Sequence, residues 1–229
     1  MKGGSVEFPA RRVLAFLKEI ALGSAGIVMK SDQENSIVDL LNVISKRRAA
    51  ASKMEGVTLG SAVPPVARTI HEQSPVADSQ SNGFIERAIQ DIEGQVRTIK
   101  SDFEPRAGEK IPSSHDLIPW LVEYAAVLLN RGRVSADGKT SYERLKGKRA
   151  AMAGMSFGER IQWRSSVPAK DRRFKMEVAW QQGIFLGQRT VSGEFLVGTK
   201  EGVFRSRTVA RLPVEKRWQD NLSFDTGLP

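Results

Sequence analysis

The sequence predicts an α/β layer, followed by a helical and basic segment and then by a small antiparallel β-barrel-like domain. Apolar residues recur with the helical period through the first 130 residues, and short apolar runs of strand type interrupt them. After Met155 the pattern changes to short β-forming runs that alternate with turns. Hydrophobic residues make up 40% and charged residues 27% of the 229 positions, which is the composition of a globular protein.

The first part of the chain should alternate between helices and strands. Residues 9–22 predict a helix with a wide apolar face, and Ile27–Met29 is a run of buried-strand type. A second helix should follow and end in the basic, alanine-rich run 46–51. After a turn-rich connection, a short strand is expected at residues 67–71.

Helix-capping patterns and apolar stripes predict the starts and faces of the helices. Ser31 and Glu34 have the S-x-x-E form of a capping box for the second helix. The clearest helix carries an apolar stripe at spacings of four and three residues, and Pro105 should end it. The stripe consists of Ile85, Ile89, Ile92, Val96, Ile99 and Phe103. A further buried helix is expected at residues 117–129.

The region after Met155 contains five runs of β-forming residues within about 55 positions. They are Arg160–Trp163, Phe174–Trp180, Gly183–Gly187, Glu194–Gly198 and Val203–Leu212. Their number and spacing predict a small antiparallel barrel or curled sheet. Its aromatic residues, at β spacing, should lie in the core rather than serve as stacking platforms for bases.

The residue inventory excludes several classes of protein. Cysteine is absent, which excludes disulfides, thiol catalysis, zinc fingers and iron–sulfur clusters. The two histidines, His71 and His115, are too few for a histidine-rich metal site. No apolar run approaches the ~20 residues that span a bilayer, and the N-terminus has no secretory apolar core. We therefore expect a protein that is neither secreted nor membrane-bound.

Positive charge is concentrated in the second half of the chain. Residues 1–104 carry 13 basic and 13 acidic side chains, whereas residues 105–229 carry 22 basic and 13 acidic ones. The segment 131–173 alone has 12 basic and 4 acidic residues. Such asymmetry favours contact with a polyanion, although a merely solvated basic surface gives the same count.

Two carboxylates stand where predicted strands and helices meet. Asp32 lies just past the apolar run 27–29, and Glu86 lies in the first turn of the long helix. Oxygen ligands held close together bind the magnesium ions of phosphoryl-transfer enzymes. The residues alone leave the simpler interpretation open, in which Asp32 is a turn residue and Glu86 complements the helix dipole.

The surroundings of these carboxylates resemble the retroviral-type integrases, especially those of copia-type retrotransposons. Residues 74–103 are similar to the last catalytic segment of that family, where a Ser/Asn-Gly loop precedes a helix bearing Glu and a basic residue, here Glu86 and Arg87. Residues 22–37 resemble the segment with the family's second catalytic Asp, which corresponds to Asp32. The Leu-Leu-Asn-Arg and Lys-Thr-x-Tyr-Glu motifs of residues 125–149 resemble the conserved region after the core. The resemblance covers roughly residues 8–218, including the β domain.

This resemblance implies an RNase-H-like core in which two Asp and one Glu hold Mg²⁺ or Mn²⁺ for DNA strand transfer. Asp32 and Glu86 would be both the catalytic and the metal-binding residues. The sequence departs from the family pattern, because no Asp precedes Asp32 and its 54-residue separation from Glu86 is unusually long. We therefore expect a truncated RNase-H-like layer without its first three strands and first Asp, inactive as this chain alone.

The resemblance also divides the chain into regions. Residues 1–104 should form the partial RNase-H-like core, 105–154 a helical and basic linker region, 155–218 the small β domain, and 219–229 a tail. DNA is the expected partner, bound by non-specific backbone contacts, and a homo-oligomer stays open. The expected DNA-binding residues are Arg97, Lys100, Arg131, Arg133, Arg144, Lys146, Lys148 and Arg149.

Two functions remain in competition at this point. The first is a retrotransposon-derived integrase fragment concerned with DNA integration, located in the nucleus or in a cytoplasmic retroelement particle. The second is a non-catalytic module derived from an integrase that binds nucleic acid or protein. The missing first Asp separates the two, since strand transfer requires it and binding does not.

Overall fold

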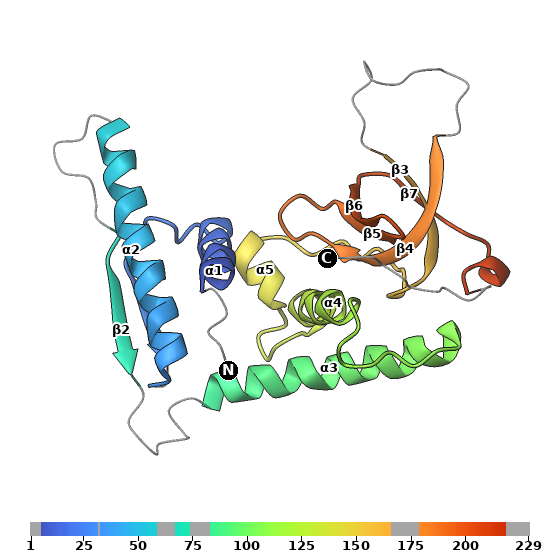
Figure 1. The fold of residues 1–229 in the computed structure, drawn as a ribbon, viewed down its shortest axis with the longest axis horizontal. Coiled ribbons are helices and arrows are strands. Elements are labelled where there is room, and N and C mark those ends of the chain that lie inside the picture. The colour runs from blue at the N-terminus through green and yellow to red at the C-terminus, as the bar shows by residue number, and fades with distance from the viewer. Residues whose placement is uncertain (1–5, 32, 59–66, 74–82, 166–178, 219–229) are drawn as a thin grey trace. The chain divides into compact units, whose positions relative to one another are not determined.

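The structure is a computed structural model that describes residues 6–31, 33–58, 67–73, 83–165 and 179–218 (Figure 1). It is a mixed helix-and-sheet protein that divides into two compact units, Met1–Ala88 and Ile89–Pro229. No helix in the described ranges is both long enough and apolar enough to span a membrane.

The first unit is built around a strand–helix–strand motif. Helix α1 (Glu7–Glu19) is followed by strand β1 (Ile27–Ser31), helix α2 (Asn35–Thr58) and strand β2 (Thr69–Gln73). The strands pair in parallel, from Ile27 opposite Thr69 to Ser31 opposite Gln73, because the intervening helix returns the chain to the same end of the sheet. Helix α1 packs against α2, which lies along the strands (Figure 1). Both strands predicted from the sequence are therefore confirmed.

Helix α2 differs from its prediction at both ends. It begins at Asn35 and continues through the basic run 46–51 to Thr58. Ser31 is the last residue of β1, four residues before the helix begins. The carbonyl of Glu34 accepts the first helical hydrogen bonds instead. The run extends the helix because its alanines and arginines are strong helix formers.

Arg48, within this run, is a buried charged residue, only 2% exposed. Its guanidinium donates to the carbonyls of Leu22 and Ala25 and to the hydroxyl of Thr69. One side chain thereby ties the loop after α1 and the start of β2 to α2. Burial lowers the pKa of Arg48 from its ordinary value.

The described part of the second unit contains three α-helices and one short 3₁₀ helix. Helix α3 (Gly83–Ala107) enters it, and α4 (Ile118–Gly132) and the short α5 (Ser141–Lys146) follow. Pro105 does not stop α3, which continues to Ala107. A proline lacks the N–H that would donate to a carbonyl in the preceding turn, but the residues after it can still form the last turn of the helix. Ile99 and Phe103 of the predicted stripe are buried, as expected, whereas Ile85 and Ile89 are exposed.

The strands of the second unit form one antiparallel sheet with the order β6-β5-β4-β3-β7. Their bounds are β3 (Arg160–Arg164), β4 (Trp180–Gln188), β5 (Phe195–Thr199), β6 (Gly202–Ser206) and β7 (Val209–Arg211), before a 3₁₀ helix (Val214–Lys216). Strand β4 begins at Trp180. Most of the predicted run Phe174–Trp180 therefore falls outside the described residues.

This sheet is strongly curled but is not a closed barrel. Strands β6 and β7 are its edges, and no pairing joins them within the described residues. Two strands separate β3 from β6, yet the rings of Trp163 and Phe204 stack with centroids 5.3 Å apart. The hydroxyl of Ser206 also donates to the carbonyl of Arg164 at 2.8 Å. The prediction of a curled sheet is confirmed. The sheet resembles a barrel in its curvature, but its edge strands do not pair within the described residues.

Helices and sheet share one core in this unit. Phe103 of α3, Leu121 and Ala125 of α4, and Ile184 and Leu186 of β4 belong to one buried cluster. The close approach of the Phe103 ring to the segment before β3 depends on Gly158, which has φ +78°. A Cβ there would lie 1.9 Å from a ring carbon of Phe103, so no other residue fits without moving the ring.

Glu159 is a buried carboxylate, 1% exposed, that pairs with Arg211 of β7 and with Arg217, just after the 3₁₀ helix. Arg211 on β7 donates to it from Nε and Nη2 at 2.5 and 2.8 Å, and Arg217 lies 3.4 Å away. The backbone N–H of Ser156 donates at 3.1 Å. Burial by itself would raise the pKa of Glu159. These hydrogen bonds and the arginine charges outweigh it, so the pKa lies below its ordinary value.

Candidate nucleic-acid interface

The two predicted catalytic carboxylates are only partly placed by the structure. Glu86 is exposed in the first turn of α3, where it complements the helix dipole, and Asp32 lies outside the described residues. The described ranges contain no group of three His, Asp or Glu side chains that could hold a metal ion. Magnesium binding by Asp32 and Glu86 therefore stays a prediction of the sequence.

The cations predicted on α3 lie beside acidic neighbours on the same helix. Arg97 is 3.8 Å from Glu93, and Lys100 is 3.5 Å from Glu104, both at the i, i+4 spacing. The Arg97 side chain is 72% exposed, and such exposed pairs contribute little because water screens them. Arg97 can therefore exchange Glu93 for a phosphate at low cost.

The arginines of residues 131–149 are held by contacts within the second unit. Arg133 pairs with Asp91 of α3, Arg144 pairs with Asp137, and Arg149 lies 3.3 Å from Glu143. Each of these three arginines therefore already has a carboxylate partner. The fourth arginine, Arg131, donates to Gln188 at 2.7 Å and stacks over the ring of Tyr142.

Asp137 and Arg144 form the best-defined of these pairs. Nε and Nη2 of Arg144 donate to the two carboxylate oxygens at 3.0 and 2.7 Å. The side-chain hydrogen bond from Arg144 lowers the pKa of Asp137 to about 2, helped by the backbone N–H of Lys139. The pair fastens the turn that contains Asp137 to α5. Arg144 therefore has a structural role, whether or not it also contacts DNA.

Helix α5 is short but well capped. The Thr140 hydroxyl accepts from the N–H of Glu143 at 3.1 Å, and the Glu143 carboxylate accepts from the N–H of Thr140 at 2.7 Å. Gly147 ends the helix in the left-handed conformation with φ +68°. The pattern Thr140-x-x-Glu143 has the form of a capping box, so the start of this helix could have been predicted from the sequence.

Lysines remain as the unpaired charges of this segment. Lys139, Lys146 and Lys148 form no ion pair within the described part of the chain, and Lys139 and Lys148 are exposed. They lie just before, at the end of and just beyond α5. Because its caps order the helix, α5 presents these ammonium groups from a defined position, which favours contact with a row of phosphates.

The aromatic residues of the sheet divide into two groups. Trp163 and Phe185 are 3% and 1% exposed, which confirms that they belong to the core. Trp180 and Phe204 are 39% and 41% exposed, so the prediction of a core role is wrong for these two. The ring of Phe204 stacks on that of Trp163.

Comparison with solved structures gives a distant likeness. No protein-family model matches the sequence, and no curated protein matches it significantly. The chain is similar to a chain in the cryo-EM structure of a simian T-cell lymphotropic virus intasome in complex with PP2A regulatory subunit B56 gamma. The TM-score is 0.43 and the identity 10%, over 94% of this chain and 67% of the other. A likeness at this level carries no conclusion about function.

Proposed function

We propose that this chain is an integrase-derived module that binds DNA through the phosphate backbone without reading base sequence. The charge distribution carries the proposal. All of the net charge of +9 comes from residues 105–229, which have 22 basic and 13 acidic side chains. Backbone contacts by Lys and Arg give affinity without sequence preference, because every base step presents the same phosphates.

The contacts within the second unit indicate which cations would carry this binding. Arg133, Arg144 and Arg149 already have carboxylate partners, so a phosphate must compete for them. Lys146 and Lys148 have no ion-pair partner within the described ranges and can neutralise a phosphate without giving one up. We therefore assign the larger share of the binding energy to these lysines and a smaller share to the arginines.

The first unit is proposed to derive from an RNase-H-like layer. The parallel β1–α2–β2 motif is compatible with it, and the resemblance of the segments around Asp32 and Glu86 supports it. Strand transfer belongs to the proposal only for an assembly that adds a third carboxylate to these two. Alone, the chain is proposed to bind DNA and not to cut it.

The proposal is tested by fluorescence anisotropy with two short DNA duplexes of unrelated sequence. The variant Lys146→Gln/Lys148→Gln should bind both duplexes more weakly by the same factor. Arg11→Gln/Lys18→Gln on α1 removes the same charge from the first unit and is the control. Equal losses for both variants would show a diffuse charge effect and contradict the assignment. Tight binding of only one duplex would contradict backbone recognition.

A charge-neutral variant separates electrostatics from structure. Asp137→Asn/Arg144→Gln removes one charge of each sign and breaks the pair beside α5. We expect its DNA affinity to stay close to that of the parent chain, because the lysines remain. A loss as large as that of the lysine variant would mean that the position of α5, not its charge, determines binding.

A further inference from the structure

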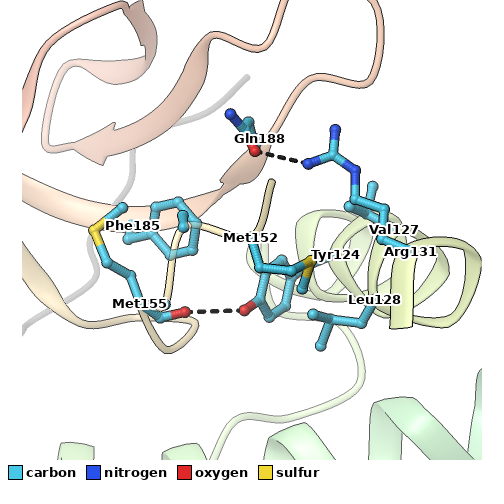
Figure 2. A pocket seen from close by; sticks show the side chains of 10 residues that line it. Tyr124, Val127, Leu128, Arg131, Met152, Met155, Phe185 and Gln188 are labelled. Carbon is cyan, nitrogen blue, oxygen red and sulfur yellow. Dashed lines mark hydrogen bonds between the residues drawn. The ribbon is translucent and has the colours of Figure 1, made fainter. Parts of the chain in front are cut away.

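A small cavity lies between α4 and β4 in the second unit (Figure 2). Its volume is about 110 Å³. Its walls are mainly apolar and include Leu128 of α4, Met152 and Met155 of the segment before β3, and Phe185 of β4. Tyr124 also lines it, and its hydroxyl donates to the carbonyl of Met155 at 3.1 Å, so this polar group is already satisfied.

The cavity has one charged group at its edge. Figure 2 shows Arg131 reaching from α4 to Gln188 of β4 beside the apolar walls. Both ends of the Gln188 amide are used, since its oxygen accepts from Arg131 and its nitrogen donates to the Gly193 carbonyl at 2.7 Å. The Nε of Arg131, in contrast, is buried without a hydrogen-bond partner in the described part of the chain. A buried Nε cannot be reached by an incoming group, so the donor of Arg131 that a bound acceptor could use is Nη2, which donates to no partner in the described part of the chain.

Size and chemistry together decide what the cavity can hold. Pockets for cofactors and nucleotides usually enclose about 300 to 1,000 Å³, well above this volume. A nucleobase would lose the hydration of its polar edges without gaining partners from Leu128, Met152 or Phe185, and this is costly. An aliphatic side chain has no such groups and gains from leaving water.

We propose that this cavity, with Arg131 at its edge, is a docking site for a partner protein that inserts an aliphatic side chain flanked by a carboxylate. The carboxylate would accept from Arg131, a charge-assisted bond of the strong kind. This interaction goes beyond DNA binding, since its contact is an apolar side chain rather than a phosphate.

Charge complementarity supports an acidic partner segment. The guanidinium of Arg131 lies 5.2 Å from the ring centroid of Tyr142, so α5 adjoins the edge of the cavity. This helix carries Lys146, and Lys148 follows it directly. Met152 is 50% exposed, and an unbranched thioether side chain can adjust to an incoming group.

The test is a titration of the full chain, labelled with ¹³C at its methionine methyl groups, with short synthetic peptides. Acetyl-Asp-Leu-Asp-amide should shift the Met152 and Met155 signals in a saturable way and leave that of Met29 on β1 unchanged. Replacing Leu by Ala should weaken binding more than tenfold, since about three buried carbons are lost. Replacing both Asp by Asn should weaken it about tenfold, through loss of the charge-assisted bond.

A matched pair of variants locates the binding. Val127→Phe places a ring in the cavity and should abolish the shifts. Val122→Phe makes the same change on an exposed part of α4 and should preserve them. Tryptophan fluorescence verifies that both variants are folded. Binding unchanged by Val127→Phe, equal binding of the Leu and Ala peptides, or no shift at millimolar peptide would overturn the proposal. It is also overturned if a thymidine oligonucleotide, but not the peptide, shifts Met152 and Met155.

Discussion

Replacing Glu159 by Gln should destabilise the second unit more than any exposed charge removal. Glu159 is 1% exposed and faces Arg211 and Arg217, so the neutral amide loses two charge-assisted bonds and turns an N–H₂ group towards a guanidinium. Breaking a buried pair costs about 3 to 5 kcal/mol. Arg211 is 41% exposed and Arg217 21%, and water can therefore replace part of the loss. We expect about 2 to 3 kcal/mol.

Thermal unfolding followed by tryptophan fluorescence measures this loss in the correct unit, because all four tryptophans lie within Ile89–Pro229. They are Trp120, Trp163, Trp180 and Trp218. For about 140 residues the unfolding entropy is about 0.3 kcal/mol/K, so Tm should fall by about 7 to 10 °C.

Asp102→Asn is the control, since it breaks an exposed pair of 2.6 Å with Arg106 and should shift Tm little. Equal Tm shifts for the two variants would refute the reasoning. The effect should also depend on pH. Because the folded pKa of Glu159 lies below the unfolded value of about 4.3, its contribution is full above that value. The contribution is lost as the pH falls through the folded pKa, so the difference between parent and variant should shrink in acid.

Three further predictions concern other parts of the chain. Thr140→Ala removes the hydroxyl that accepts from the N–H of Glu143 and should destabilise α5 by about 1 kcal/mol, measurable as faster amide exchange at Arg144 and Leu145. Unchanged exchange would contradict the role of the cap. Amides of Ile27–Ser31 should exchange faster than those of Ile184–Leu186, because β1 and β2 form only a two-stranded sheet within the described residues. The side chains of Val28 and Ile70 on these strands are 59% and 43% exposed. Equal protection of the two segments would contradict the low stability of the first unit. The chain alone should not join or cut DNA ends with Mg²⁺ or Mn²⁺, and Glu86→Gln should leave DNA affinity unchanged; turnover that this variant abolishes would contradict an inactive module.

The periodicity of the sequence predicted most of the fold because burial determines it. The helical stripe buries Ile99 and Phe103, and the β-forming runs at Gly183–Gly187 and Glu194–Gly198 contain the buried residues of β4 and β5. The strand at Ile27–Met29 forms where it is predicted but is not of the buried type, since Val28 is 59% exposed. The predictions were wrong about the ends of two helices, where the apolar period stops but the residues still favour a helix. Helix α2 continues through residues 46–51, and α3 continues beyond Pro105, because the pattern ends there while the helical backbone does not.

The candidate sites could be predicted only in part, since partners distant in sequence decide what a charged side chain does. Arg48 reads as part of a basic run, yet 2% exposure and contacts with Ala25 and Thr69 make it a core residue. Arg133 reads as a DNA contact and pairs with Asp91, 42 positions away. The cavity beside Arg131 is lined by residues from α4, the segment 152–155 and β4. The spacing of these residues in the sequence gives no indication that they lie together.

The salt dependence of DNA affinity tests the central claim, backbone binding through the basic surface of the second unit, most directly. For the full chain, log Kd should vary linearly with log salt concentration, with a slope of about 0.9 for each phosphate neutralised. The variant Lys146→Gln/Lys148→Gln should lower this slope by about 2, and Arg11→Gln/Lys18→Gln should leave it unchanged. A slope near zero for the parent chain, or the same slope for parent and lysine variant, would contradict the claim.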